Sequence, residues 1–530
     1  MLTPDTPPPE DYYQNNCLSL FRFVLEQYEA LLDEPVAEAL HGYEVLSHDA
    51  QRLFARLLTR KGPLIRADSL DYQEVRDEAG ALRELEDAGF VDLNSSAPAD
   101  RILNLLRKAE LVSLVGAPRK LAKPATVEWL IAHYSDRQLQ TRMNELFVWV
   151  SVARPRIWWL VRLLFFGDTH QDWSAFVIRD LGMVRYESVP MQARRFETRS
   201  ALAEELRYRQ LSQLSRRLDE HPGLAAELVD ELQADVADRF VQSRRERALL
   251  RIGRWYERAD AAHEAVEVYQ RVGAHPARER IVRTLQRSGN SSDAQRWLLT
   301  ICAAPYSEEE AQFAERFGKR KAGYQPPVTR IDIEQARTDI EQQALELLLE
   351  SGEWGVHVEN SLVRSLTGLM YWRAIFADVP GAFSNPFQFG PNDLYRDDFY
   401  NAREELIQTI EDQLVDDRAL SMHLTSLAME KRGVANSLVN WQLLDQIPIA
   451  QILDAMPLDD IRRLGHFLIR NLSARRAGLP DLFIVRGPKD YEFVEVKGPN
   501  DQLQPGQRVW FKHFARLGIP ARILKLRLAA

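Results

Sequence analysis

The chain has 530 residues, of which 45% are hydrophobic and 27% are charged, so it is expected to fold as two to four globular domains. Its net charge of -9 excludes a histone-like coat of positive charge, but it does not exclude local patches that bind nucleic acid. Two cysteines, Cys17 and Cys302, exclude a disulfide framework and a cysteine-based zinc site.

The N-terminal sequence predicts neither a targeting segment nor a membrane anchor. MLTPDTPPPEDYY lacks the basic and apolar regions of a signal peptide, and its first nine residues are expected to be disordered. The apolar run IWWLVRLLFF (157–166) is half a membrane span at best and contains Arg162, so it predicts a buried helix. We therefore expect a cytoplasmic protein without a membrane partner.

The first third of the chain predicts small helical modules. Helical spacing begins near Tyr12 and defines an N-terminal helical segment, 1–46. Helices followed by the short strand 90–93 predict a winged-helix-like unit over 47–95, with DNA contact left open. Residues 96–165 resemble a SAP-type helix-loop-helix region.

Basic and aromatic residues in this third are candidate contacts to DNA. In the SAP-like region, Arg119, Lys120 and Lys123 form a basic loop of the kind that binds a phosphate backbone. Trp158 and Trp159 are candidates for stacking on unpaired bases, although a Trp pair on an apolar helix more often belongs to the core.

The middle of the chain predicts helices almost throughout, with hardly any strand pattern between 140 and 350. We expect a helical connector over 166–240 and a tetratricopeptide-like domain over 241–356, where Tyr256, Ala265 and Tyr269 match positions of paired helices. Just before that repeat, arginines recur at three- and four-residue steps and share one helix face that could bind phosphate. They are Arg244, Arg247, Arg251, Arg254 and Arg258.

The last sixth changes to α/β structure. Strands are predicted at 481–485 and 491–497 around the turn 487–490, followed by a helix over 505–517 and a strand over 521–528. Since side chains alternate along a strand, Glu495 and Lys497 share a face. Asp481 starts the antiparallel partner strand and so lies across from them.

Two carboxylates and one ammonium at one rim of a sheet predict either an ion-paired cluster or a metal site. Oxygen ligands of this kind suit Mg²⁺ or Mn²⁺, and Lys497 could position a water or stabilise charge on a phosphate. A third carboxylate is expected from a preceding helix. P-D and E-V-K separated by thirteen residues, between apolar strands, are far more specific than E-x-K alone.

This pattern resembles the PD-(D/E)xK nuclease superfamily, and EVKGPNDQLQPGQRVW resembles its VRR-NUC branch, including Gln507 and Trp510 in Q-x-x-W. Together with HVENSLVRSLTGLMYWRAIF (357–376), FFGDTHQDWSAFVIRDLGMVRYE (165–187) and the helical regions, nearly the whole chain is similar to the Fanconi anaemia-associated nuclease family. Eukaryotic members carry an additional N-terminal zinc finger, which this sequence lacks, so it looks like a bacterial member. The expected fold is multidomain and α-rich, with a C-terminal α/β VRR-NUC domain over 357–530.

The resemblance implies a DNA nuclease that cleaves 5′ flaps near the junction, has 5′-to-3′ exonuclease activity and acts in interstrand crosslink repair. It places catalytic roles on Glu359, Asp481, Glu495, Lys497 and Gln507. The metal, Mg²⁺ or Mn²⁺, would be held by Glu359, Asp481, Glu495 and the Val496 carbonyl. It also puts Arg247 in a pocket for the 5′-terminal phosphate. Leu362, Leu366, Leu369 and Met370 are the predicted buried face of the helix after Glu359.

The implied partner is branched or flapped DNA. Other repair proteins are open as partners, and both a monomer and a dimer formed on DNA are compatible with the sequence. Two alternatives are weighed against flap cleavage: a Holliday-junction resolvase, which the long helical regions would obstruct as a symmetric dimer, and a catalytically silent DNA-binding scaffold. The scaffold is disfavoured because all four charged residues of the motif are present.

Overall fold

The fold is given by a computed structural model that describes residues 11–60, 62–115, 118–167, 185–189, 194–317, 324–335, 337–498 and 501–528. The first nine residues, and most of the 165–187 stretch used for the family resemblance, lie outside the described residues. The chain forms two compact units, Met1–Tyr186 with Ser384–Phe387, and Glu187–Phe383 with Gln388–Ala530. Each unit is described by itself.

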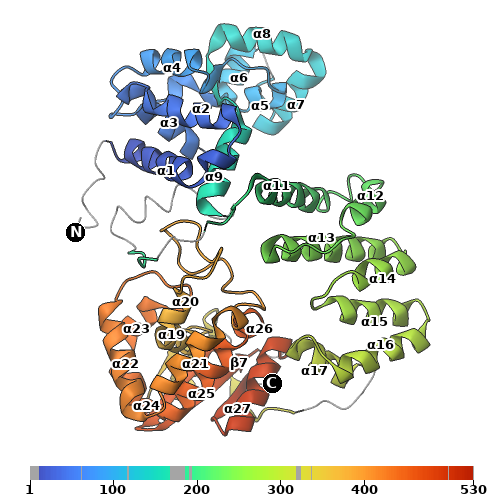
Figure 1. Ribbon diagram of the computed structural model, residues 1–530, viewed down its shortest axis with the longest axis vertical. Coiled ribbons are helices and arrows are strands. Elements are labelled where there is room, and N and C mark those ends of the chain that lie inside the picture. Colours follow the sequence, from blue (N-terminus) through green and yellow to red (C-terminus); the bar gives the residue numbers. More distant parts are fainter. Residues whose placement is uncertain are drawn as a thin grey trace. The chain divides into compact units, whose positions relative to one another are not determined.

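The first unit combines helices with one small sheet (Figure 1). Its helices are α1 (Tyr12–Tyr28), α2 (Glu34–Glu44), α3 (His48–Thr59), α4 (Glu78–Asp87), α5 (Ala99–Leu103), α6 (Lys108–Val115), α7 (Lys123–His133), α8 (Asp136–Leu146) and α9 (Pro155–Phe166), with 3₁₀ turns at Glu29–Leu31 and Ala67–Ser69. Its antiparallel sheet has the order β1-β3-β2, formed by β1 (Ile65–Arg66), β2 (Val91–Leu93) and β3 (Trp149–Val152).

The winged-helix-like segment has the predicted helix signals. The Ser47 side chain accepts a hydrogen bond from the Ala50 N–H at the start of α3, as an N-cap does. Gly89, with φ of +73°, follows α4 and turns the chain into β2. The central strand of the sheet, β3, comes from residues that the sequence suggested would belong to the SAP-like region, so the two segments share this sheet.

The apolar run at 157–166 is a buried helix, as predicted. Within α9, Trp158 is 5% exposed and its ring lies 4.9 Å from Phe54, 5.6 Å from Phe90 and 5.6 Å from Phe21 between centroids. The base-stacking hypothesis is therefore wrong for Trp158, which belongs to the core of the first unit. Among the described residues, no helix is long and apolar enough to cross a membrane.

The second unit begins with a stack of helices in which α13 to α17 pack in chain order (Figure 1). The helices are α11 (Arg199–Leu214), α12 (Leu224–Glu231), α13 (Arg239–Arg258), α14 (Ala262–Gln270), α15 (Ala277–Arg287), α16 (Ser291–Ala303) and α17 (Glu308–Arg316). Ala265 and Tyr269 are fully buried, and the Tyr269 ring lies against Gly253, where a Cβ would approach Cε1 to 2.4 Å. A small residue at 253 is what lets α13 and α14 pack this closely.

The rest of the second unit is the α/β region. Its helices are α18 (Ile340–Leu348), α19 (Leu362–Met370), α20 (Trp372–Ile375), α21 (Glu404–Gln413), α22 (Asp417–Glu430), α23 (Trp441–Gln446), α24 (Ile449–Ala455), α25 (Leu458–Ile469), α26 (Leu472–Arg475) and α27 (Pro505–Leu517), with a 3₁₀ turn at Asn401–Arg403. Its strands are β4 (Val328–Ile333), β5 (Trp354–His357), β6 (Leu482–Gly487), β7 (Asp490–Lys497) and β8 (Ala521–Leu528).

The five strands form one mixed sheet in the order β4-β8-β7-β6-β5. The β5–β6 and β6–β7 pairs are antiparallel, whereas β8 lies parallel to both β7 and β4. One face packs on Leu345 of α18, and the other packs on Trp510 and Phe514 of α27. The expected α-rich chain with a C-terminal α/β domain is confirmed.

Four strands of the described residues, β1, β3, β4 and β5, were not predicted from the sequence pattern. β3 and β4 both lie in the stretch 140–350, which was expected to be almost purely helical. β4 is an edge strand beside β8, and most of its residues are exposed or half-buried, so it lacks the apolar run of a buried parallel strand. The C-terminal sheet therefore includes β4 and most of β5, which lie before residue 357, the predicted start of the C-terminal domain.

Candidate active site

The mouth of the β6–β7 hairpin brings the predicted charged residues together. Leu482 pairs with Val494, so Asp481, one residue earlier, lies beside Glu495 on the same face. The Val496 N–H donates to the Asp481 carboxylate at 2.8 Å. This backbone bond fixes Asp481 against the end of β7.

Glu495 is the buried centre of the cluster, with 1% of its surface exposed. Its Oε1 accepts hydrogen bonds from Lys497 Nζ at 2.7 Å and from Gln507 Nε2 at 2.5 Å. Its Oε2 is buried and has no hydrogen-bond partner within the described residues. A buried carboxylate oxygen without a donor is costly, and it is the oxygen that a cation could take up.

Gln507 is held in place by the start of α27. Its Oε1 accepts from the Gln504 N–H at 2.9 Å in a capping box, which leaves its Nε2 to bond Glu495. Gly478 allows this helix end to approach, because a Cβ there would come within 2.6 Å of the Gly506 backbone and its φ is +92°. The sequence offered one signal for this contact, the glycine in RAGLPD, and it was not recognised.

Glu359 lies at the rim of the same cluster, between β5 and α19. The Asp481 carbonyl accepts from the N–H groups of Val358 (2.7 Å) and Glu359 (3.3 Å). Asn360 follows with a φ of +58° and accepts from the Leu479 N–H at 3.0 Å. Backbone contacts thus place Glu359 beside Asp481. The predicted apolar face of the helix after it is buried as expected: Leu362, Leu366, Leu369 and Met370.

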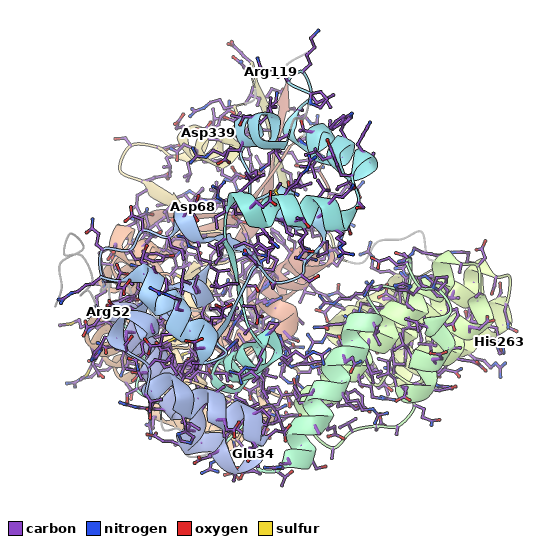
Figure 2. The ribbon with its side chains drawn as sticks, turned by 90° about the horizontal axis from the view of Figure 1, so that it is seen from above. Glu34, Arg52, Asp68, Arg119, His263 and Asp339 are labelled. Atoms are coloured by element: carbon purple, nitrogen blue, oxygen red, sulfur yellow. The ribbon has the colours of Figure 1, made fainter. Side chains whose placement is uncertain are left out.

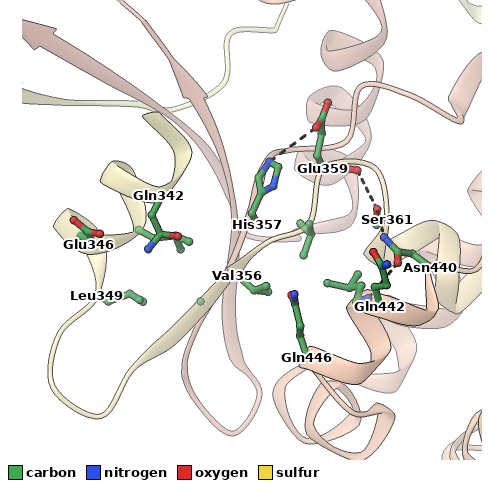
Figure 3. Close-up of a pocket in the computed structure, with 14 residues that line it drawn as sticks. Gln342, Glu346, Leu349, Val356, His357, Glu359, Ser361, Asn440, Gln442 and Gln446 are labelled. Carbon is green, nitrogen blue, oxygen red and sulfur yellow. Dashed lines mark hydrogen bonds and ion pairs between the residues drawn. The ribbon is translucent and has the colours of Figure 1, made fainter. Parts of the chain in front are cut away.

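The Glu359 carboxylate itself points outward. It is 63% exposed and lies 4.0 Å from His357 Nε2 (Figure 3). Within the described residues, no group of three or more His, Cys, Asp or Glu side chains is close enough to hold a metal ion. Asp481 and Glu495 therefore lie together in this conformation, whereas the side chain of Glu359 is adjacent but points away from them.

The electrostatics of the assembled pair favour a positive ion beside it. Burial, followed by the charge of Asp481, raises the pKa of Glu495 to about 7, and burial also raises the pKa of Asp481. The buried Glu495 and the half-buried Asp481 repel each other, which favours a proton or a cation between them. The donor set is all oxygen, which fits a hard divalent ion such as Mg²⁺ or Mn²⁺.

The arginines of α13 do not all face solvent freely. Arg244 pairs with Glu205 at 2.8 Å, and Arg251 donates to Ser212 Oγ at 2.7 Å and Ser215 Oγ at 3.0 Å. Arg247 donates only to the Ser243 carbonyl and forms no ion pair within the described part of the chain. Arg254 is exposed.

Two further arginines, missed by the sequence analysis, surround Arg247. Burial lowers the pKa of Arg247, and so do the charges of Arg244, Arg396 and Arg216. Burial and neighbouring arginines also lower the pKa of Arg251, to about 10. Arg216 and Arg396 lie far from Arg247 in sequence, so no local spacing could reveal them. The result is a positive cluster suited to an anion.

The predicted basic loop of the SAP-like region joins α6 to α7. Arg119 and Lys120 are exposed, and Figure 2 shows Arg119 at the outer tip of this loop. Lys123 is half-buried, and its Nζ donates to the Asn104 carbonyl at 2.9 Å. Arg119 and Lys120 are thus exposed to solvent, as contact with a phosphate backbone requires.

Comparison with known proteins identifies the class of the site first. Residues 421–527 match the family model of the VRR-NUC domain, and residues 11–92 match that of the FAN1 HTH domain. The hairpin and α27 fall inside the first match. The C-terminal region is therefore a nuclease domain.

The relatives extend over the whole chain. A Fanconi-associated nuclease 1 homolog from Pseudomonas aeruginosa is 30% identical, covering 97% of this chain and 96% of the relative. A homolog from Oryza sativa is 25% identical over 98% of this chain and 63% of its own length. A crystal structure of paFAN1 bound to 2nt 5′ flap DNA with a gap matches 99% of this chain and all of that chain (100%), with a TM-score of 0.88 and 28% identity.

The chain belongs to the Fanconi-associated nuclease 1 family, and the resemblance seen in the sequence is confirmed. It is thus a member of a family of nucleases that act on DNA.

Proposed function

We propose that this protein is a structure-specific DNA nuclease that cleaves 5′ flaps near the junction, with 5′-to-3′ exonuclease activity, in interstrand crosslink repair. The observation that carries the proposal is the hairpin mouth, where Asp481 and the buried Glu495 meet beside Lys497. The family relationship and the flap DNA in the solved relative support the substrate class.

The metal site is proposed on Glu359, Asp481, Glu495 and the Val496 carbonyl. The Oε2 of Glu495, which has no hydrogen-bond partner among the described residues, and the raised pKa values of Glu495 and Asp481 fit a divalent cation. Glu359 is exposed and lies next to Asp481 along the backbone, so rotation of its side chain can complete the set. When bound, Mg²⁺ or Mn²⁺ would polarise the scissile phosphate and lower the pKa of a water.

Lys497 and Gln507 would position the reacting groups around Glu495. Lys497 is held 2.7 Å from Glu495, where its ammonium can orient a water or stabilise the negative charge that builds on the phosphate. Gln507 on α27 donates a hydrogen bond to Glu495 and so holds its carboxylate in place. Burial keeps bulk water from screening these charges.

Arg247 and its neighbours Arg216 and Arg396 are the proposed anchor for the 5′-terminal phosphate. A phosphate dianion placed among them would relieve the mutual repulsion that lowers the pKa of Arg247. An anchor at a fixed separation from the hairpin would select which bond is cut. Arg119, Lys120 and Lys123 are proposed to contact the duplex backbone.

The test uses a fluorescent 5′-flap duplex with wild type and Asp481→Ala in Mg²⁺, Mn²⁺ and EDTA. We expect metal-dependent cutting near the junction, and we expect Asp481→Ala to reduce the rate at least about a thousandfold while flap binding persists. Asp490→Ala, at the exposed start of β7, is the matched control and should cut normally.

Three further DNA substrates test the exonuclease activity, the repair role and the resolvase alternative. A recessed 5′-phosphate duplex tests exonuclease activity, a crosslinked flap tests the repair role, and a four-way junction tests resolvase activity. Symmetric cutting of the junction in preference to the flap would favour the resolvase alternative. A wild type that binds the flap but cuts it with neither metal would contradict the proposal and leave a DNA-binding scaffold.

A further inference from the structure

A hollow of about 560 Å³ adjoins the proposed metal site on its β5 side. It is bounded by α18, β5 and α23, and Glu359 lies on its wall (Figure 3). Its volume falls in the range of roughly 300–1,000 Å³ that is typical of sites for small ligands. None of the residues that carry the nuclease chemistry, other than Glu359, lines it.

The wall of this hollow is rich in amides. Gln342 on α18 and Gln442 and Gln446 on α23 line it, and Figure 3 shows them around the same space. All three side chains are exposed, and none has a hydrogen-bond partner within the described residues. Each carries one acceptor oxygen and two donor hydrogens, so the hollow presents several unused donors and acceptors.

The charge of the wall argues against a phosphate as the ligand. Among the described residues, no lysine or arginine lines the hollow, whereas Glu359 does and so does Glu346, which pairs with Arg337 at 2.8 Å. An anion would be repelled, and a neutral polar group would not. The half-buried Leu349 and Val356 in its lining add apolar surface against which a flat ring can pack.

The hollow lies next to the residues that are proposed to bind the cleaved strand. Glu359 lines the hollow, and its N–H bonds the Asp481 carbonyl at 3.3 Å. A scissile phosphate bound at Asp481 would therefore bring a neighbouring nucleotide close to this opening. Amides bond base edges, and both Asn and Gln do so in DNA complexes.

We propose that the hollow receives an unpaired base from the nucleotide next to the scissile phosphate, with Gln342, Gln442 and Gln446 bonding its edge. The proposal rests on the proposed function. Because a Gln amide can turn its donor or acceptor toward the ligand, the site accepts any of the four bases. It thus selects an unstacked nucleotide, as found at a flap, and not a sequence.

The binding test places 2-aminopurine, whose fluorescence rises on unstacking, at successive positions around the cut in the 5′ flap. Asp481→Ala protein in Mg²⁺ keeps the strand intact. We expect a fluorescence rise at one position next to the cut. The double substitution Gln442→Leu with Gln446→Leu should abolish most of that rise, whereas Gln451→Leu, an exposed glutamine on neighbouring α24 that does not line the hollow, should preserve it.

The cutting test uses otherwise active protein and a flap with an abasic nucleotide at that position. Wild type should cut the abasic flap about tenfold more slowly than the normal one, a size consistent with losing a base contact. The Gln442→Leu, Gln446→Leu protein should cut both flaps at the same slow rate. Unchanged melting temperatures establish that these surface substitutions leave the fold intact.

The outcomes separate the two proposals. If wild type cuts normal and abasic flaps equally fast and 2-aminopurine fluorescence rises at no position, the proposed base-binding site is wrong. The proposal of flap cleavage is then unaffected. If wild type cuts no flap at all, the proposed function fails and the base site fails with it.

Discussion

At the scale of single residues, Glu495 is defined by what surrounds it. It is almost completely buried, accepts two hydrogen bonds on one oxygen and has none on the other. Its neighbour Asp481 adds a second carboxylate in the same buried space. Without a cation, the pair of Glu495 and Asp481 has its lowest free energy when one carboxylate holds a proton.

This arrangement predicts a pH-dependent stability in the metal-free protein. The pKa of Glu495 is raised from 4.5 to about 7 in the folded state. Between these values the folded protein therefore holds a proton that the unfolded chain has released, so the free energy of unfolding falls as the pH rises from 4.5 to 7. We expect a loss of about 2 kcal/mol across this window, measured by urea unfolding in EDTA.

Glu495→Gln provides the control for that measurement. The neutral amide cannot titrate, so most of the loss between pH 4.5 and 7 should disappear, and the raised pKa of Asp481 should account for what remains. Adding Mg²⁺ at pH 8 should stabilise wild type more than the variant, because a bound cation takes the place of the proton. A wild type whose stability rises over this window would show that Glu495 is charged and well paired without metal.

Residue-scale prediction from sequence succeeded where local geometry determines position. Strand alternation put Glu495 and Lys497 on one face, and hairpin pairing put Asp481 across from them, as the structure has it. Arg216 and Arg396 were out of reach, because their meeting with Arg247 depends on tertiary packing between distant segments. Glu359 came only from the family resemblance, and nothing local predicts that its carboxylate turns outward.

At the scale of elements, α27 and β8 begin and end where the sequence predicted, and the hairpin strands do so within two residues. The turn residues account for the limits of the hairpin strands. Pro505 at the first helical position and Gly518 after the last one account for the limits of α27. β4 was missed because only Ile333 among its residues is buried. The approach of α27 to the RAGLPD loop was not predicted either, because Gly478 indicates a close contact but not which backbone makes it.

That backbone contact predicts the effect of Gly478→Ala. The new Cβ would lie 2.6 Å from the Gly506 carbon and 2.7 Å from the Gln507 nitrogen, at a φ of +92°. We expect a loss of about 1–3 kcal/mol in stability. Because α27 must shift, Gln507 should lose its bond to Glu495, and flap cutting should slow by about tenfold or more.

Gly487→Ala in the β6–β7 turn is the matched control, since no atom lies within 4 Å of its added Cβ. It should keep both stability and cutting near the wild-type values in thermal unfolding and flap assays. Normal cutting by Gly478→Ala would mean that the α27 start can move without disturbing Glu495, and Gln507 would then have no positioning role.

At the scale of the whole molecule, the chain is two units, and the proposed anchor and cutting site both belong to the second one. Within that unit, the start of α13 is tied to the loop before α21. Arg239 donates to Asp393 and to Asp398, each at 2.9 Å, and Arg396 donates to the Arg239 carbonyl at 2.5 Å. These bonds join the helix that carries Arg247 to the α/β region.

The tie between α13 and the α/β region predicts a defect in where the strand is cut. Arg239→Ala removes both ion pairs of Arg239, whereas the buried Asp393 keeps Arg403 at 2.9 Å, so the fold should survive. With α13 less firmly placed, the separation between Arg247 and the hairpin should vary. We expect cut sites on a 5′-phosphorylated flap to spread over several bonds, with flap affinity changed less than about threefold, as read on a sequencing gel.

Arg207→Ala is the control for this prediction, because it breaks an exposed pair with Glu231 inside the helical stack and leaves the tie intact. Its cut pattern should match wild type. If Arg239→Ala cuts at the same single bond, the 5′ phosphate does not set the cut position through α13. The choice of bond would then be made at the hairpin, by the nucleotides that surround Asp481 and Glu359.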